Sequence, residues 1–214
     1  MTLSRGGILF VVSAPSGTGK STLSRRLIES VSGLAFSVSY TTRPRRAGEE
    51  SGREYQFVDD AQFDSMVAAD EFLEWATVFG RRYGTGRVAT RSQCAKGLDL
   101  LLDIDVQGAR QVRESGLPSV SIFILPPDYT TLASRLRSRG SEDPENLAVR
   151  LLEARREAME YDLFDYVVVN ADLESACEEL IAIVRAERAR AKHRRPDVAR
   201  ILATFPAPGS GAQE

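Results

Sequence analysis

The residues best suited to chemistry in this sequence lie in one short glycine-bearing segment near the N-terminus. A run of five apolar residues, Ile8-Leu-Phe-Val-Val12, leads into Ser13-Ala-Pro-Ser-Gly-Thr-Gly-Lys-Ser21. A buried strand followed by a turn and a helix start leaves free backbone N–H groups and the positive end of the helix dipole facing one point, where an anion binds. Lys20 adds a mobile positive charge for outer phosphates, and the Ser21 hydroxyl can ligate the magnesium ion that accompanies a nucleotide. The sequence therefore predicts a nucleotide phosphate site formed by Ala14, Pro15, Ser16, Gly17, Thr18, Gly19, Lys20, Ser21 and Thr22.

The phosphate segment departs from the general pattern Gly-x-x-x-x-Gly-Lys-Ser/Thr at its first position, where this chain has Ala14. Alanine suffices if the backbone there does not need a positive φ, and Gly17 and Gly19 still supply conformational freedom. The alternative interpretation is a purely structural turn between a strand and a helix. We disfavour it because strand, loop, Lys-Ser and helix all occur in the required order.

A second candidate is the carboxylate of Asp103, at the end of the apolar run Leu98–Asp105. This run is apolar on both faces, which is typical of a buried parallel strand. A lone aspartate at a strand end would more often cap a helix. Together with a phosphate site, Asp103 is predicted to position water around magnesium opposite Ser21.

Arginines form the third candidate group. Phosphoryl transfer spreads negative charge over oxygens that guanidinium groups match in pairs, and it requires neither histidine nor a nucleophilic cysteine. The alternative role for such arginines is to lie on a solvated helix face, as we expect for Arg25, Arg26 and Arg137. The two clusters are Arg43, Arg45 and Arg46 in one segment, and Arg135, Arg137, Arg139 and Arg150 in another.

The composition is that of an ordinary globular protein, with 43% hydrophobic residues, 27% charged residues and a formal net charge of −2 over 214 residues. The length suits one α/β domain with inserted lobes. The charge gives no reason to expect nucleic acid as a partner. Cys94, Cys177 and His193 are isolated, so neither a disulfide framework nor a zinc site is predicted. No apolar run is long enough to span a membrane, and we expect a cytoplasmic protein without a membrane partner.

The elements that must position these residues follow from hydrophobic periodicity. Helical spacing predicts helices at about 20–31, 106–114, 145–160 and 173–190, and another that begins at Asp59 or Asp60 and carries Phe63. Strand patterns occur at 36–41, 54–58, 72–78, 98–105, 120–125 and 166–170. The order predicts an α/β fold with a parallel sheet core and helices on both faces, a small sheet-rich insertion and an arginine-rich helical flap. Trp75 is expected in the core of the insertion, since an aromatic residue on an alternating strand usually packs there.

An ordered set of motifs resembles the guanylate kinase family, over roughly residues 7–190. The motifs are Ser13–Ser21, Ser37-Val-Ser-Tyr-Thr-Thr-Arg43, Arg46-Ala-Gly-Glu49, Gly52-Arg-Glu-Tyr55, Phe72-Leu-Glu-Trp75, Tyr83-Gly-Thr85, Leu102-Asp-Ile-Asp-Val-Gln-Gly108, Arg135-Leu-Arg-Ser-Arg-Gly140 and Val169-Asn170. The resemblance implies a P-loop NTPase-type core and transfer of the γ-phosphoryl group of ATP to GMP or dGMP, in purine nucleotide metabolism and GMP recycling. It also implies one domain over 5–190, with core segments 5–35, 95–130 and 156–190, a GMP-binding lobe at 36–90, a lid at 130–155 and a partly disordered tail at 191–214.

The resemblance also implies roles for individual residues. ATP would be bound by the phosphate loop with Arg135, Arg139 and Asn170, and Mg²⁺ by Ser21 and Asp103. Lys20, Arg43, Arg139 and Arg150 would stabilise the transferred group. GMP would be bound by Ser39, Arg43, Arg46, Tyr55, Glu74, Tyr83, Thr85 and Asp105. The chemistry of guanine fits this set independently, because a carboxylate such as Glu74 can accept from both N1–H and the exocyclic amino group, while O6 needs a hydroxyl donor.

Some positions depart from the family pattern: Pro44 directly after Arg43, Arg45 where proline is frequent, Arg82 in place of tyrosine and Ala171 in place of aspartate. Two other functions share the fold. A non-catalytic phosphopeptide-binding module would not need Gly19-Lys20-Ser21 or the flap arginines. A ribose-phosphate kinase would not need Ser39, Glu74 and Thr85 together.

Overall fold

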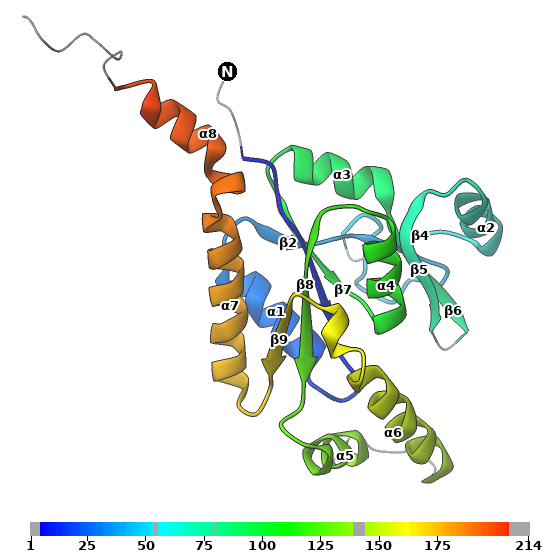
Figure 1. Ribbon diagram of the computed structural model, residues 1–214. Coiled ribbons are helices and arrows are strands. Elements are labelled where there is room, and N and C mark those ends of the chain that lie inside the picture. The colour runs from blue at the N-terminus through cyan, green and yellow to red at the C-terminus, as the bar shows by residue number, and fades with distance from the viewer. Residues whose placement is uncertain (1–4, 54, 79, 139–143, 206–214) are drawn as a thin grey trace, which may run out of the picture.

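The structure is a computed structural model that describes residues 5–53, 55–78, 80–138 and 144–205. A five-stranded parallel sheet, in the order β2-β7-β1-β8-β9, forms the centre, and a four-stranded sheet in the order β4-β3-β6-β5 lies beside it (Figure 1). The strands of the main sheet are β1 (Leu9–Ser13), β2 (Leu34–Phe36), β7 (Asp99–Asp103), β8 (Ser119–Leu125) and β9 (Tyr166–Val169). The predicted α/β class with a parallel core is confirmed.

Helices cover the main sheet on both faces, and most residues of its central strands are therefore buried. Every residue of β1 is buried, and its register places Val12 beside Asp103 of β7. One face packs against α1 (Lys20–Ser30) and α7 (Leu173–Ala189), and the other against α3 (Arg87–Ala95) and α4 (Val106–Glu114). The carboxyl ends of β1 and β7 therefore meet at one edge, where a parallel sheet of this type binds its ligand.

The small sheet comprises β3 (Ser39–Thr41), β4 (Tyr55–Phe57), β5 (Phe72–Val78) and β6 (Arg81–Gly86), and α2 (Asp60–Ala68) packs against it. The prediction of one strand over 36–41 was wrong. Its first residue ends β2 in the main sheet, and Ser39 begins β3 in the small one. Alternation indicates extended backbone but not which sheet it joins.

The sequence patterns did not predict β6 or α3. Asp59 caps α2, as one of the two predicted alternatives, in a capping box with Gln62.

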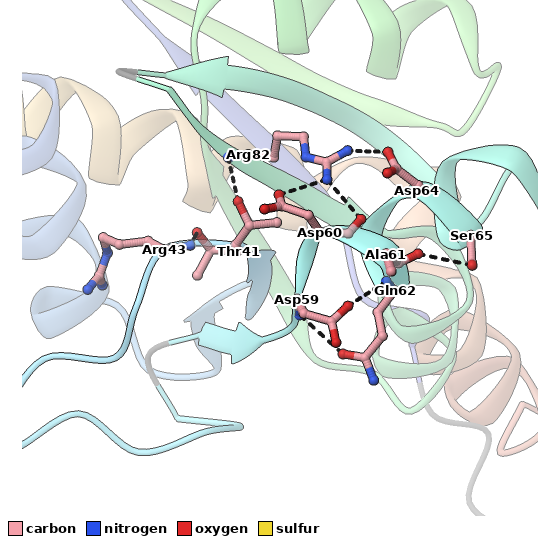
Figure 2. A network of polar contacts seen from close by, with 10 residues as sticks. Thr41, Arg43, Asp59, Asp60, Ala61, Gln62, Asp64, Ser65 and Arg82 are labelled. Carbon is pink, nitrogen blue, oxygen red and sulfur yellow. Dashed lines mark hydrogen bonds and ion pairs between the residues drawn. The ribbon is translucent and has the colours of Figure 1, made fainter.

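Arg82 fastens α2 to the small sheet (Figure 2). From β6 its guanidinium donates to the carbonyl and the carboxylate of Asp60 at 2.8 Å each and pairs with the carboxylate of Asp64. The same guanidinium lies 4.8 Å from the centre of the Phe63 ring. Arg43 points away from this network in the same view. Arg82, which stands where the family often has tyrosine, thus has a structural role in the lobe. Its side chain and that of Arg43 point in different directions (Figure 2).

The predicted flap consists of α5 (Tyr129–Ser138) and α6 (Pro144–Ala158), which share a small apolar cluster of Leu132, Leu136 and Ala154. Asp128 caps α5 by accepting from the Thr131 N–H at 2.7 Å. A short 3₁₀ helix, η1 (Tyr161–Leu163), leads from α6 to β9. Arg139 and residues 206–214 lie outside the described residues.

The segment after α7, predicted as a partly disordered tail over 191–214, begins with a helix that the sequence did not predict. Helix α8 (Ala191–Leu202) follows directly after Arg190 and leads away from the body of the molecule (Figure 1). Its interior contains Pro196, a residue that normally predicts a helix boundary. That proline obscured the helix in the sequence. Within the part of the chain that the structure describes, no helix is long and apolar enough to cross a membrane.

Candidate active site

The predicted phosphate loop lies between β1 and α1, and its two inner glycines are needed for its shape. Gly17 and Gly19 have φ of 91° and 93°, in the left-handed region that disfavours side chains. A Cβ at Gly19 would also lie 2.6 Å from the amide nitrogen of Asn170. Among the described residues other than glycine only Asp70 has a positive φ, so Ala14 fits the first position of the motif without strain.

The middle of the loop is held by residues from distant parts of the chain. The side-chain amide of Asn170 donates to the Thr18 carbonyl at 2.6 Å, and Arg135 donates to the Asn170 carbonyl at 3.1 Å. Asn170 is buried, yet its side-chain oxygen has no hydrogen-bond partner among the described residues. A pocket of about 310 Å³ adjoins it, lined by Gly17, Gly19, Thr22, Arg135, Ser138, Asn170 and Leu173. An unused buried acceptor beside an open pocket suits a ligand with an N–H donor.

Lys20, the first residue of α1, and Asp103, the last residue of β7, lie next to each other. The Lys20 ammonium pairs with the Asp103 carboxylate and donates to the Ile104 carbonyl at 2.9 Å. Ser21 is exposed in the first turn of α1, where no side chain caps the helix. Among the described residues no group of three His, Cys, Asp or Glu side chains is arranged to hold a metal. Ser21 and Asp103 alone can supply only part of a coordination sphere, as in sites where the substrate phosphates complete it.

The flap touches the loop through α6. Arg150 donates to the Ser16 hydroxyl at 2.8 Å, and the Glu157 carboxylate accepts from the Ser16 N–H at 3.4 Å. Burial raises the pKa of Glu157 above its ordinary value. Predicted residues Arg135 and Arg150 are thus both placed against the loop, and Glu157 is a neighbour that the sequence did not indicate.

A second cluster joins the small sheet to α4. The Thr85 hydroxyl donates to Glu74 Oε1 at 2.5 Å and lies 3.5 Å from the Ser39 hydroxyl. Asp105 caps α4 by accepting from the Gly108 N–H at 2.7 Å, and a Cβ at Gly108 would lie 2.8 Å from Glu74 Oε2. The residues predicted around guanine, Ser39, Glu74, Thr85 and Asp105, are therefore brought together.

Glu74 is an ionisable group in an unfavourable place for a charge. Its side chain is 5% exposed. Burial raises the pKa of Glu74 to about 7, the Thr85 hydrogen bond opposes this effect, and the charge of Asp105 adds to it. A ligand that offers two N–H donors would relieve the cost of the buried carboxylate.

A third cluster lies in the same lobe and is basic and aromatic. Arg43 pairs with Glu49 at 2.7 Å, and its guanidinium lies 5.4 Å from the centre of the Tyr55 ring. The rings of Tyr55 and Tyr83 are 5.9 Å apart at their centres. Arg46 has an exposed side chain, and its backbone N–H donates to Glu49 at 2.7 Å. Arg43, Tyr55 and Tyr83 thus converge as predicted, with Arg46 at the rim.

Comparison with known proteins agrees with this arrangement. The family model for guanylate kinase matches residues 7–187. The chain belongs to the guanylate kinase family. It is 49% identical over 191 residues to the guanylate kinase of Nitrobacter hamburgensis, covering 89% of this chain and 87% of that one. It is 50% identical over 188 residues to the guanylate kinase of Neisseria meningitidis serogroup B, covering 88% and 92%.

A solved structure of the family has the same fold. The crystal structure of guanylate kinase from Anaplasma phagocytophilum superimposes with a TM-score of 0.70 at 34% identity, covering 94% of this chain and 98% of that one. The match covers nearly all of this chain, so the overall fold that gathers the three clusters is similar in that guanylate kinase.

Besides Glu157, two residues that support these clusters, Glu49 and Gln111, were not predicted as site residues from the sequence. Glu49 was noted only as part of a motif, although it holds Arg43 and the Arg46 backbone together. Gln111 was not singled out, although its side chain bonds the backbone of Trp75. For Glu49 the sequence does contain a local signal, because this carboxylate lies only six positions after Arg43 and three after Arg46. For Gln111 no local signal exists, since its partner lies 36 positions away.

Proposed function

We propose that this chain is a guanylate kinase that transfers the γ-phosphoryl group of ATP to GMP, giving ADP and GDP. The observation that carries the proposal is the buried carboxylate of Glu74, with Thr85 and Ser39 beside it, in a chain that also has an intact phosphate loop. A guanine base satisfies this set, because its N1–H and amino group donate to the carboxylate while its O6 accepts from a hydroxyl. Adenine presents an acceptor to the same carboxylate and would leave the charge unpaired.

The donor nucleotide would lie along the phosphate loop. Backbone N–H groups at the start of α1 and the Lys20 ammonium would bind its phosphates. The free acceptor of Asn170 and the neighbouring Arg135 line the pocket that suits the adenine ring. An adenine amino group would donate to the Asn170 oxygen, which supports ATP as the donor.

The acceptor nucleotide would lie in the small lobe, with its phosphate held by Arg43, Arg46, Tyr55 and Tyr83. Arg43 offers a planar pair of N–H donors that matches phosphate oxygens, and Tyr55 and Tyr83 offer hydroxyl donors. Asp105 would complete the guanine pocket from the side of α4. Since the GMP phosphate would face the phosphate loop, the two substrates can be aligned.

In the reaction a phosphate oxygen of GMP attacks the γ-phosphorus of ATP, a new P–O bond forms, and the bond to the β–γ bridging oxygen breaks to release ADP. The transition state carries spread negative charge, so the protein acts by alignment and by neutralisation. We assign these roles to Lys20, Arg43, Arg139 and Arg150. Contacts of α6 with Ser16 suggest how the lid closes over the donor phosphates and excludes water.

Magnesium fits the residues at this edge of the sheet. The Ser21 hydroxyl and the Asp103 carboxylate are oxygen ligands of the kind that Mg²⁺ prefers, and nucleotide phosphates would supply the rest. When bound, the ion neutralises phosphate charge and orients the γ-phosphoryl group. We further propose that dGMP is accepted and that the enzyme works in the cytoplasm on free nucleotides, in purine nucleotide metabolism and GMP recycling.

The experiment that tests the proposal is initial ADP release from Mg-ATP with GMP, dGMP, AMP, CMP and a ribose phosphate as parallel acceptors. We expect turnover with the two guanine nucleotides and little with the others. If no acceptor gave turnover while the folded chain still bound GMP or a phosphopeptide, the chain would be a binding module instead. Lys20→Ala should abolish turnover with the circular dichroism spectrum unchanged, and retained activity would contradict the phosphate-loop assignment.

A further inference from the structure

A glutamine side chain of the core, that of Gln111, binds the backbone of an edge strand in the small lobe. β5 is the edge strand of the small sheet, and on its inner side Trp75 is paired with Gly84 of β6. On its outer side the Trp75 N–H donates to Gln111 Oε1 at 2.9 Å, and Gln111 Nε2 donates to the Trp75 carbonyl at 2.9 Å. The amide of Gln111 thus satisfies both outward backbone groups of Trp75, as a residue of a neighbouring strand would.

Gln111 belongs to a row of residues on α4 that faces the guanine cluster. Asp105, Gly108 and Gln111 are spaced by three positions, which brings them onto one side of the helix. Asp105 is the N-cap of α4 and accepts a hydrogen bond from the Gly108 N–H. A Cβ at Gly108 would lie 2.8 Å from Glu74 Oε2. The helix therefore approaches Glu74 closely at one turn, and at the following turn it forms hydrogen bonds with the next residue of the strand, Trp75.

The residues of β5 differ in how they are fixed. Leu73, which is 3% exposed, packs in the apolar cluster that includes Leu9 and Val112 of the core. Apolar packing is not directional and tolerates small shifts of a strand along its axis. The two hydrogen bonds from Gln111 to Trp75, in contrast, fix the position of β5 along its axis. A slip of one residue would turn every side chain of the strand to its other face. Trp75 itself is 38% exposed, so its ring is only partly packed and the expectation that it lies in the lobe core was wrong.

We propose that Gln111 is a positioning residue for guanine recognition: its amide fixes the register of β5 on α4 and so holds the Glu74 carboxylate at the depth that the guanine edge requires. The role rests on the proposed function, in which Glu74 accepts from N1–H and the amino group of GMP. Gln111 does not touch the base. It acts through the backbone of Trp75, the residue directly after Glu74.

The test uses Gln111→Met, which keeps the length of the side chain and removes both hydrogen bonds. The readout is the ratio of kcat/KM for GMP to that for inosine monophosphate, which lacks the amino group that Glu74 would bind. We expect the ratio to fall roughly tenfold, in line with the loss of well-placed hydrogen bonds. The KM for ATP and the thermal midpoint should change little, because the Trp75 groups lie where water can replace the amide. Gln93→Met, on an exposed face of α3, is the matched control and should change nothing.

The double variant Glu74→Gln/Gln111→Met separates positioning from a general structural role. If Gln111 acts through Glu74, adding Gln111→Met to Glu74→Gln should change the ratio by less than about twofold. Equal losses with GMP and inosine monophosphate, or independent losses in the double variant, would overturn the proposal. Gln111→Ala replaces the methionine variant if that chain does not fold.

The outcomes also distinguish this inference from the function on which it rests. If Glu74→Gln leaves the ratio unchanged, the guanine-reading assignment is wrong and the role of Gln111 falls with it. If Glu74→Gln lowers the ratio and Gln111→Met does not, the guanine site stands and Gln111 has no part in positioning it.

Discussion

The two ends of the small lobe each contain a glutamate, and the two carboxylates are in opposite situations. Glu74, at the proposed base end, is 5% exposed, and burial raises its pKa to about 7. Glu49, at the proposed phosphate end, pairs with Arg43, and the hydrogen bonds from Arg43 and from the Arg46 backbone lower its pKa. One carboxylate is short of donors, whereas the other is supplied with them.

This difference indicates a division of work within the lobe. A buried carboxylate with a single side-chain donor, the Thr85 hydroxyl, favours a base that brings further donors and disfavours a base without them, so the base end gives selectivity. An arginine held by a carboxylate and two tyrosines offers charge to any phosphate, whatever base is attached. The phosphate end should therefore control affinity and rate and leave the choice of base unaffected.

The largest expected effect tests the phosphate end. Arg43→Ala should lower kcat/KM for GMP by about 10²–10³-fold, because a guanidinium matched to developing phosphate charge is removed. The ratio of GMP to inosine monophosphate should stay within about twofold of its original value. Steady-state kinetics with both acceptors measures the two quantities. Arg25→Ala, on the exposed face of α1, is the control and should retain full activity. A changed ratio for Arg43→Ala would mean that the two ends are not independent.

The next effect tests the base end. Glu74→Gln should lower kcat/KM for GMP by roughly 10²-fold, since one of the two guanine donors then faces an amide nitrogen. The KM for ATP should be nearly unchanged, because Glu74 does not line the donor pocket. Acceptor and donor titrations measure the two constants. Equal losses for ATP and GMP would assign Glu74 a structural role.

The pH dependence of GMP use sharpens the comparison further. The free enzyme must lose the Glu74 proton before the carboxylate can accept from guanine. With the pKa of Glu74 at about 7, the KM for GMP should rise about tenfold as the pH falls from 8 to 6. The GMP phosphate also titrates near this range. Glu74→Gln serves as the reference, because its profile retains the phosphate step and lacks the Glu74 step.

The smallest effect concerns stability and has the opposite sign. The pKa of Glu74 is higher in the folded chain than its ordinary value of 4.5, so its contribution is present below that value and is lost as the pH rises through about 7. Glu74→Gln should therefore raise the free energy of unfolding at pH 8 by about 1–3 kcal/mol. At pH 4.5 the gain should be much smaller. Denaturant titrations at the two pH values measure both, and an equal gain at each pH would exclude the charge as the cause.

The central sheet and the phosphate loop could be predicted from the sequence because their signals are local. The apolar run into Gly17 and Gly19 indicates a buried strand and a loop wherever the rest of the chain lies. Trp75 shows where such reasoning ends. On β5 the glutamate is buried and the tryptophan is 38% exposed, the reverse of what polarity predicts. The core helix α4, which comes some 30 residues later, creates the site for Glu74, and no local pattern could indicate it.

The other differences also come from long-range contacts. The segment 36–41 divides between two sheets because β2 finds a partner in β7 and β3 finds one in β6. Asn170 and Thr18 meet although 152 positions separate them. These contacts depend on the order of strands in the assembled sheets. The resemblance to a family supplied the residues involved, whereas their geometry required the structure.

The ion pair of Lys20 with Asp103 has a consequence for the form of nucleotide that the site accepts. The two charges cancel each other. A polyphosphate that bound only Lys20 would leave the Asp103 carboxylate without a counter-charge, next to the negative phosphate oxygens. A polyphosphate that brings a divalent cation would leave neither residue unpaired, because its oxygens could bind the Lys20 ammonium while the cation, directly or through water, offsets the Asp103 carboxylate. The site should therefore favour ATP that arrives with its metal over ATP without it.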